Sequence, residues 1–322
     1  MRKIFFRADA GADIGYGHFI RTLALADILK DDFDCTFFTA EPTSYQIGEL
    51  KKVCKHVALE ETGKFETFLD YLKGDEIVVL DNYFYTTEYQ RQIKEKGCCL
   101  IFIDDMHDRH YVADLIINQA VNITPEDYSC EAYTRFALGM KYTLLRRPFY
   151  EACKRVHDSD KENTLRIVVA FGGSDFMDLT GKTINGIVNL NIISSITAIV
   201  GDSYSSDKMI ENEKVTYLKN QTAQQIADLF SSCDVAILPS STMMSEAMAC
   251  GTTIIGGYYV LNQMNDYYVF SNMNMILGVG DYSDLDVVER IKKQLYGIVT
   301  KRSNMITAEI PQLFLNLFKS LY

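Results

Sequence analysis

The sequence has little that would suit a secreted, membrane-spanning or nucleic-acid-binding protein. None of its eight cysteines belongs to a C-x-x-C pair, which argues against a disulfide framework or a zinc site and indicates reduced thiols in a cytoplasmic protein. No apolar stretch approaches the roughly 20 residues of a membrane span, and the apolar run at the amino terminus is too short for a signal peptide. With 43 acidic and 32 basic residues, the net charge of −11 disfavours nucleic acid as a partner. A small anionic ligand is compatible with this charge, because it needs only a local site.

The 322 residues do contain a double series of short apolar runs separated by polar stretches. Such runs are typical of buried parallel strands, and the amphipathic stretches between them, such as 86–96, are typical of crossover helices. The polar stretch 156–164 suits a linker. The expected strands are 3–6, 35–38, 77–80, 100–103 and 115–117 in the first half, and 167–171, 196–200, 215–218, 235–238 and 253–255 in the second.

These patterns predict an α/β protein made of two doubly wound, Rossmann-like domains that face a cleft. The first domain is expected at 1–155 and the second at 165–322, and the last helix is a candidate to pack back on the first domain. At this length each domain is large enough for its own core. In open sheets of this kind ligands bind beyond the carboxyl ends of the strands, so the residues that follow each strand are the candidates for chemistry.

A glycine-rich turn joins the first expected strand to a helix that is apolar on one face. Gly15 and Gly17 let the backbone come close to a ligand, and the N–H groups at the start of the helix favour an anion. His18 stands where the turn becomes the helix, which places a titratable base at the rim of the crevice. Asp13, in the same turn, is a candidate to orient His18. The G-x-G-x-x-G spacing is absent, however, and a lone histidine at a helix start is often only a surface or capping residue.

Polar side chains also follow the next strands of the first half. They are expected to face the same crevice as His18, because parallel strands end at one edge of the sheet. Asp104, Asp105 and His110 could ligate a metal, but aspartates at strand tips more often cap the following helix, and the spacing matches no dedicated metal cage. We therefore predict no metal. The polar residues at these strand tips are Asp81, Asn82, Tyr83, Asp104, Asp105, Asn118 and Gln119.

The second half has two further turns of this type. Residues 172–175, Gly-Gly-Ser-Asp, follow a strand and are expected to open a helix, with Ser174 as its cap. Strand 235–238 leads into a hydroxyl-rich helix start, which suits a phosphate, and Glu246 lies about one turn into that helix. Its carboxylate could accept hydrogen bonds from a ribose diol or merely offset the helix dipole, and the pattern does not separate the two. The predicted nucleotide-binding residues are Gly173, Ser174, Ser240, Ser241, Thr242, Glu246, Asn262 and Gln263.

Several of these motifs occur together in one known family. The chain resembles the UDP-sugar hydrolases of nonulosonic (pseudaminic) acid biosynthesis, the PseG type, and their spore-coat polysaccharide relatives. The likeness runs through most of the chain and is most specific in an opening motif, R-x-D-x-x-x-x-I-G-x-G-H-x-x-R. This motif is met by Arg7, Asp9, Ile14, Gly15, Gly17, His18 and Arg21. Further matches are Asp81-x-Tyr83, Asp104-Asp105, Asp114, Asn118, Tyr142-x-Leu144-x-Arg146-x-x-Phe149, Gly172-Gly173-Ser174-Asp175, Glu246-Ala247 and Asn262-Gln263. We expect Arg7 and Asp9 to brace the loop, and the role of Arg21 stays open.

The resemblance implies a MurG-like GT-B fold and a UDP-sugar partner, with UDP on the C-terminal domain. It implies hydrolysis of a UDP-linked acetamido-deoxysugar by water that attacks the anomeric carbon with inversion, without a cofactor or a metal. His18 matches the general base of the family, and Tyr83 matches a tyrosine beside that base. The expected substrate contacts are Gly15, Gly17, Asp13 and Asn118. Two alternatives stay open: a UDP-sugar-dependent glycosyltransferase on the same fold, and a nucleotide-sugar-binding protein without turnover.

Overall fold

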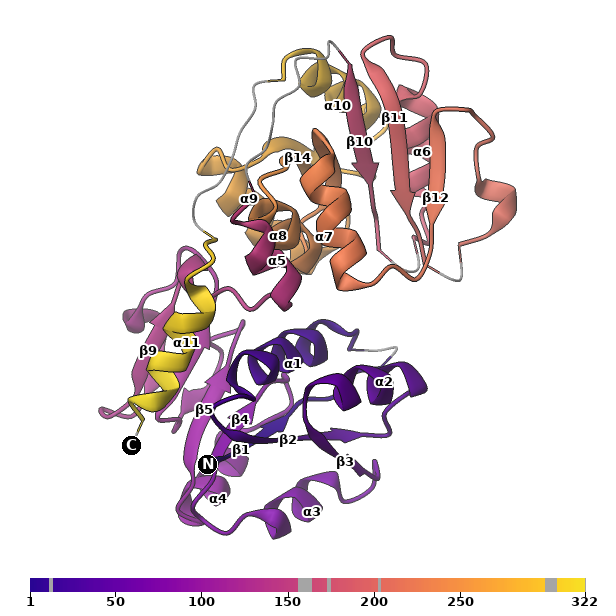
Figure 1. Cartoon of the computed structure of the whole chain (residues 1–322). Helices are drawn as coiled ribbons and strands as arrows, with labels where there is room; N and C mark the ends of the chain where they lie inside the picture. The colour runs from indigo at the N-terminus through magenta and orange to yellow at the C-terminus, as the bar shows by residue number, and fades with distance from the viewer. Residues whose placement is uncertain (12–13, 156–163, 173–174, 202–203, 299–305, 322) are drawn as a thin grey trace. The chain divides into compact units, whose positions relative to one another are not determined.

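The computed structural model describes residues 1–322 apart from 12–13, 156–163, 173–174, 202–203, 299–305 and 322 (Figure 1). The chain divides into two compact units, Met1–Arg147 with Glu309–Tyr322, and Pro148–Ala308. Each unit has its own parallel sheet and its own hydrophobic core. The expected linker, 156–164, lies outside the described residues except for its last position.

The first unit is built on a seven-stranded parallel sheet. In spatial order its strands are β3 (Lys55–Leu59), β2 (Asp34–Ala40), β1 (Lys3–Arg7), β4 (Ile77–Leu80), β5 (Cys99–Ile103), β7 (Leu115–Asn118) and β9 (Arg135–Leu138). A separate short pair consists of β6 (His110–Tyr111) and β8 (Ser129–Cys130). The helices are α1 (Gly17–Leu29), α2 (Ser44–Val53), α3 (Lys64–Tyr71), α4 (Thr87–Glu95), η1 (Pro125–Asp127), η2 (Met140–Tyr142) and α11 (Ile310–Lys319). Helices α1 and α2 cover one face of the sheet, and α3 and α4 cover the other (Figure 1).

The second unit repeats this plan with a six-stranded parallel sheet. In spatial order its strands are β12 (Val215–Leu218), β11 (Ile193–Ile199), β10 (Leu165–Val169), β13 (Val235–Pro239), β14 (Thr253–Tyr258) and β15 (Leu277–Asp281). The helices are α5 (Arg147–Ala152), α6 (Leu179–Ile187), η3 (Ser206–Lys208), α7 (Ala223–Ser232), α8 (Thr242–Ala249), η4 (Leu261–Gln263), α9 (Met264–Asn272) and α10 (Val287–Tyr296). Across the described residues of both units, no helix combines the length and the hydropathy that a membrane crossing requires.

Both sheets reverse their strand order at the same point of the topology. β1 lies between β2 and β4, and β10 lies between β11 and β13. At such a switch point the connections leave in opposite directions and open a crevice at the carboxyl ends of the two central strands. In the first unit Arg7 pairs with Leu80, so the turn before α1 and the residues after β4 start side by side. In the second unit Val169 pairs with Ile237, which brings the turn after β10 next to the start of α8.

The predicted α/β class with two doubly wound parallel sheets is confirmed, since every predicted apolar run overlaps a strand. The interior strands were the easiest to find, because burial on both faces demands a continuous apolar run. β4, for example, is buried at all four positions. Prediction missed the short pair β6 and β8, and it missed three edge strands of the large sheets, β3, β9 and β15. Their sequences KHVAL, RFAL and LGVGD mix polar or glycine positions into the run, as an exposed edge permits.

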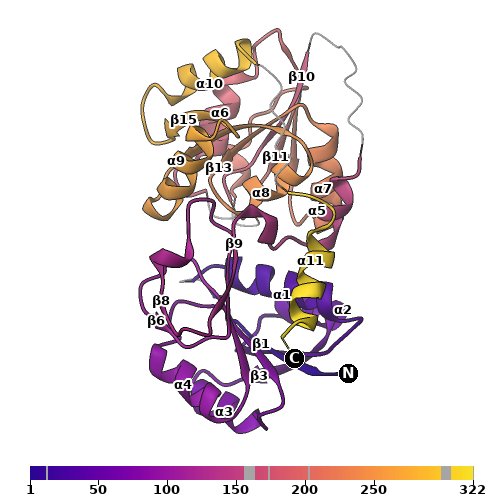
Figure 2. The same ribbon diagram turned by 90° about the vertical axis from the view of Figure 1, so that its left-hand side faces the viewer.

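The last helix of the chain belongs to the first unit. Ile310, Phe314 and Phe318, spaced at i, i+4 and i+8, are buried, and α11 packs against α1 (Figure 2). The ring of Phe318 meets that of Phe33 at a centroid distance of 6.4 Å, and Lys319 pairs with Asp32 at 2.6 Å. The chain therefore finishes its first core with residues from its far end.

Candidate functional site

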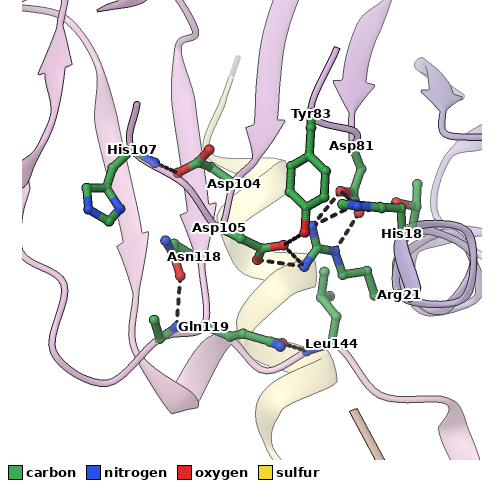
Figure 3. Close-up of polar contacts among 12 residues, drawn as sticks. His18, Arg21, Asp81, Tyr83, Asp104, Asp105, His107, Asn118, Gln119 and Leu144 are labelled. Atoms are coloured by element: carbon green, nitrogen blue, oxygen red, sulfur yellow. Dashed lines mark hydrogen bonds and ion pairs between the residues drawn. The ribbon is translucent and has the colours of Figure 1, made fainter. Parts of the chain in front are cut away.

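The side chain of His18 is held by a carboxylate from a neighbouring strand end. His18 is the second residue of α1 and is buried, and its Nδ1 lies 2.7 Å from Oδ1 of Asp81, which directly follows β4 (Figure 3). None of the described residues hydrogen-bonds Nε2. Because a carboxylate can only accept at this distance, Nδ1 carries the proton and Nε2 presents a lone pair. This arrangement fixes the imidazole through Nδ1, and Nε2 is the ring nitrogen that remains for a ligand or a proton.

The carboxylate of Asp81 is ionised at neutral pH, and each of its lone-pair positions accepts a hydrogen bond. Besides His18, its oxygens accept hydrogen bonds from Arg21 Nε at 2.7 Å, Arg21 Nη2 at 2.6 Å and Thr22 Oγ1 at 2.8 Å. A carboxylate has about four lone-pair sites, so none is left over. Burial by itself would raise the pKa of Asp81, but the neighbouring charge of Arg21 and the hydrogen bonds from Arg21 and His18 lower that pKa below its usual value. Asp81 therefore orients the imidazole and takes no proton from it.

Tyr83 covers one side of the imidazole. Its ring stands edge-on to that of His18, with centroids 4.4 Å apart, and its hydroxyl points to Oδ2 of Asp105 at 3.4 Å (Figure 3). The side chain is half exposed. Burial and the charge of Asp105 raise the pKa of Tyr83 to about 12, so at neutral pH the group is a phenol that can donate a hydrogen bond. The polar groups that line the small pocket here are His18, Arg21, Asn82, Tyr83, Asp104, Asp105 and Arg109.

The glycine turn before α1 is open to ligand on its outer side. Gly15 has a φ of +71°, and an added Cβ at Gly15 or Gly17 would meet no atom within 4 Å. Gly11 and Gly15 exchange backbone hydrogen bonds that close the turn. The loop therefore leaves free space beside its backbone, as a substrate contact at Gly15 and Gly17 requires. Asp13, the other predicted contact in this turn, lies outside the described residues.

Arg7 and Asp9 form a buried ion pair beneath the turn. Asp9 also accepts from the backbone N–H of Ala40 at 2.7 Å and pairs with Lys64 at 3.1 Å. Asn82 accepts from the N–H of Asp9 at 2.7 Å. These contacts tie the ends of β1, β2 and β4 together, so the two charged residues brace the loop from below.

Asn118 and Asp104 belong to an internal hydrogen-bond network. Asn118 is 1% exposed, and it donates to the hydroxyl of Tyr128 and accepts from the N–H of Ala120, both at 2.8 Å. Asp104 accepts from Tyr111 at 2.6 Å and from Tyr128 at 3.1 Å. One N–H and one lone pair of the Asn118 amide are engaged within the first unit. Asn118 does not line the small pocket beside His18, and its contact with substrate stays a prediction.

The residues considered for a metal are engaged elsewhere. Asp104 binds the two tyrosine hydroxyls, and Asp105 binds Arg21. His110 lies 2.8 Å from Ser129 Oγ and 3.2 Å from Glu131 Oε1. Among the residues that the structure describes, no three His, Cys, Asp or Glu side chains are grouped as metal ligands would be.

In the second unit, the start of α8 is open. Ser240 ends the strand side of the turn and is buried, while Ser241 and Thr242 are exposed. Ser241 occupies the N-cap position without making a side-chain cap, and the first turn carries no acidic residue. The first N–H groups of α8 thus face outward with the positive end of the helix dipole behind them. Glu246 is 3% exposed and lies one turn further along the same helix.

The start of α6 differs from the prediction. The expectation that 172–175 open this helix directly was wrong, because α6 begins at Leu179. Asp175 lies four residues before the helix, and its carboxylate accepts hydrogen bonds from the N–H groups of Leu179 at 2.8 Å and Thr180 at 2.9 Å. A carboxylate already occupies the position that a phosphate would need. Gly173 and Ser174, predicted to contact nucleotide, lie outside the described residues.

The remaining predicted nucleotide contacts follow β14. Asn262 is exposed on η4. Gln263, the last residue of η4, accepts from the N–H of Tyr259 at 3.1 Å, which fixes the bend between β14 and α9. Asn262 is therefore available to a ligand, whereas the side-chain oxygen of Gln263 is already engaged within the turn.

Sequence reasoning missed how three residues of α1 work together. His18, Arg21 and Thr22 stand at i, i+3 and i+4, so they share one face of the helix, and that face meets Asp81. The polar triplet within an otherwise apolar helix face was the available signal. The partner could not be read from sequence spacing, because Asp81 lies 63 residues from His18.

Comparisons with known proteins found relatives over most of the chain. No protein-family profile matches the chain. It is 25% identical to the UDP-2,4-diacetamido-2,4,6-trideoxy-beta-L-altropyranose hydrolase of Campylobacter jejuni, across 81% of this chain and 93% of that protein. Its homologues thus include a UDP-sugar hydrolase. The spore coat polysaccharide biosynthesis protein SpsG of Bacillus subtilis is 22% identical across 85% of this chain and 82% of its own length. Both relationships confirm the predicted resemblance.

A third relative is matched over only part of its own length. A protein of unassigned function from Methanocaldococcus jannaschii is 26% identical across 79% of this chain, and the chain spans only 55% of that relative.

Solved structures identify the fold. MurG of Acinetobacter baumannii superposes with a TM-score of 0.65 at 11% identity, covering 99% of this chain and 100% of that one. HepE of Anabaena, solved in complex with UDP, gives 0.60 at 12% identity, with coverage of 99% and 100%. At these identities the likeness establishes the architecture alone. The predicted GT-B, MurG-like fold is confirmed.

Proposed function

We propose that this protein hydrolyses a UDP-linked acetamido-deoxysugar to UDP and the free sugar. The observation that carries the proposal is the His18–Asp81 pair: Nδ1 is held at 2.7 Å by an ionised carboxylate, and Nε2 has no partner among the described residues. The relationship to a UDP-sugar hydrolase supports the same chemistry. The relationship to SpsG is consistent with a role in nonulosonic acid or surface polysaccharide biosynthesis.

In the proposed reaction, Nε2 of His18 accepts a proton from water as the water oxygen bonds to the anomeric carbon. The bond from that carbon to the β-phosphate oxygen breaks on the opposite side, which inverts the configuration. Asp81 stabilises the imidazolium without taking its proton. General base catalysis of this kind contributes about 10²–10⁴-fold. Because UDP is a weakly basic leaving group, the reaction needs no general acid, only stabilisation of the charge that grows on the diphosphate.

The diphosphate is proposed to bind at the start of α8. The outward N–H groups of that helix and the hydroxyls of Ser241 and Thr242 suit phosphate oxygens, and Glu246 is proposed to accept hydrogen bonds from the ribose. Asn262 is proposed as a further nucleotide contact. Tyr83, as a protonated phenol beside His18, is proposed to donate to the sugar.

A glycosyltransferase remains the second candidate, because the solved structures with this fold include glycosyltransferases. In that reaction a sugar or lipid hydroxyl replaces water as the group that His18 deprotonates. Release of UDP from a UDP-sugar without any acceptor separates the two candidates. A hydrolase turns over steadily under these conditions, whereas a transferase is almost idle.

The test of the proposal is the His18→Phe variant, assayed with a panel of UDP-amino-sugars for UDP and free sugar. We expect turnover to fall by at least about a hundredfold, because the aromatic ring keeps the shape but removes the base. UDP binding, measured by calorimetry, should stay unchanged and serves as the control for folding. A near-normal rate in this variant would reject His18 as the base, and tight binding without product in the wild type would favour the non-catalytic reading.

A further inference from the structure

One arginine links both carboxylates that surround His18. Arg21 presents Nε and Nη2 to Asp81 and presents Nη1 to both oxygens of Asp105, at 2.7 and 2.8 Å. We propose that Arg21 and Asp105 are positioning residues: they fix the protonated nitrogen of His18 and hold Tyr83 over its ring. The expected effect of these two residues on turnover rests on the proposed function. Their effect on which ring nitrogen of His18 carries the proton does not.

The guanidinium is locked because it is bound on two edges. The Arg21 side chain is 11% exposed, Asp81 is fully buried, and Asp105 is 30% exposed. Side-on, two-point pairing of a planar guanidinium with a carboxylate restricts its rotation far more than a single contact does. With Asp81 alone, only the Nε–Nη2 edge of the guanidinium would be held. With Asp105 on Nη1 as well, the plane of the guanidinium cannot turn without breaking bonds at both ends.

The fixed guanidinium of Arg21 determines which nitrogen of the His18 imidazole carries the proton. Nδ1 of His18 lies 2.7 Å from Asp81 Oδ1 and 3.1 Å from Arg21 Nη2. If Nδ1 were unprotonated, its lone pair would face an anionic oxygen at the shorter distance, and only the longer contact to Arg21 would be favourable. The shorter contact prevails, so Nδ1 is the donor. Keeping Asp81 ionised and in place, which Arg21 does, keeps Nε2 as the basic nitrogen.

Asp105 connects this arrangement to the residue that covers the ring. Its Oδ2 accepts from Arg21 at 2.8 Å and lies 3.4 Å from the hydroxyl of Tyr83. The second distance is long for a hydrogen bond, so the phenol is held weakly and can leave Asp105 for a substrate oxygen. Removing the negative charge of Asp105 therefore loosens Arg21 and frees Tyr83 together.

The test compares Asp105→Asn with Asp114→Asn as a matched control. Asp114 has a similarly exposed side chain, at 27%, and pairs with Lys94 at 2.6 Å. It precedes β7, at the opposite end of the sheet from Asp105, which follows β5. The readout is the ring-nitrogen NMR spectrum of the full chain with 15N-labelled histidine. The spectrum of His18→Phe identifies the signals of His18 among the five histidines.

We expect the wild type and Asp114→Asn to show His18 protonated at Nδ1 alone, and Asp105→Asn to show a mixture of tautomers. With a UDP-sugar, Asp105→Asn should lower kcat by about 10- to 100-fold and leave UDP affinity unchanged. Arg21→Lys keeps the charge but not the two-edged pairing, and a folded Arg21→Lys protein should shift the tautomer in the same direction. Unchanged His18 signals in Asp105→Asn would overturn the proposal. Because the spectra need no substrate, a wild type without hydrolysis would reject the proposed function and leave this result standing.

Discussion

Around His18, one arginine is shared by two carboxylates. Arg21 pairs with both Asp81 and Asp105, and Asp81 also accepts the hydrogen bond from Nδ1 of His18. A buried carboxylate is tolerated only when donors replace its lost water, and Asp81 has four of them. The donors that stabilise the buried carboxylate also keep it in place beside Nδ1 of His18, so they fix the orientation of the imidazole.

This cluster predicts how stability depends on pH. Because the folded state lowers the pKa of Asp81, the ionised carboxylate stabilises the fold at any pH above its ordinary value of about 4. As the pH falls below about 4, through the lower folded value, this contribution is lost. The measurement is the urea midpoint between pH 7 and pH 3 for the wild type and Asp81→Asn. The variant should be about 3–5 kcal/mol less stable at pH 7, and the gap should narrow in acid. A gap that stays constant down to pH 3 would contradict this assignment.

Two helices of the second unit begin at its switch point, and among the described residues their first N–H groups are satisfied differently. Asp175 fills the start of α6, whereas the start of α8 has no side-chain cap and no acidic residue. The difference comes from Asp175. A carboxylate that binds the first N–H groups of the helix that follows it competes with any external anion for those groups. We therefore assign the diphosphate to α8 in the proposed function.

A charge placed at the start of α8 should separate binding from folding. Ser241→Asp puts a carboxylate at an N-cap position, where it favours the helix itself, but it should repel a diphosphate and weaken UDP binding by about tenfold. Thr222→Asp is the matched control, since Thr222 is the exposed N-cap of α7. Calorimetry with UDP should show a loss for the first variant and none for the second. Equal affinities in both variants would place the diphosphate elsewhere.

At the scale of the whole chain, the first core is completed only when the end of the chain has arrived. Residues 309–322 belong to the first unit, and α11 supplies three buried apolar side chains to it. Arg135, on the edge strand β9, binds the backbone and side chain of Ser320 at 3.1 and 2.9 Å. The order of the chain therefore makes the first unit depend on residues that follow the second unit.

Truncating one of these side chains should destabilise the first unit. Phe318 is fully buried against Phe33, so Phe318→Ala should cost about 3–5 kcal/mol of unfolding free energy. Asn316→Ala, on the exposed side of the same helix, is the control and should change stability by no more than about 0.5 kcal/mol. Urea denaturation measures both variants. UDP binding, which is proposed for the second unit, should survive in both variants. Equal stabilities would show that α11 is only loosely attached.

The sequence by itself determined the strand positions at the centre of each sheet and the turn that carries His18. Burial on both faces requires continuous apolar runs, and a backbone turn open to a ligand requires glycine; both demands are local and can be read one stretch at a time. Three of the four edge strands of the large sheets, β3, β9 and β15, escaped prediction, because an edge strand has a neighbour on one side only and places fewer demands on its sequence.

Only the tertiary structure decided which carboxylate holds His18 and which helix start is open. Asp81 meets His18 because β4 pairs with β1 rather than with β3, and that order depends on the packing of the entire sheet. Asp175 closes α6 because the chain makes an extra turn before Leu179. Hydrogen bonds between residues distant in sequence follow from the fold, and a local pattern carries no information about them.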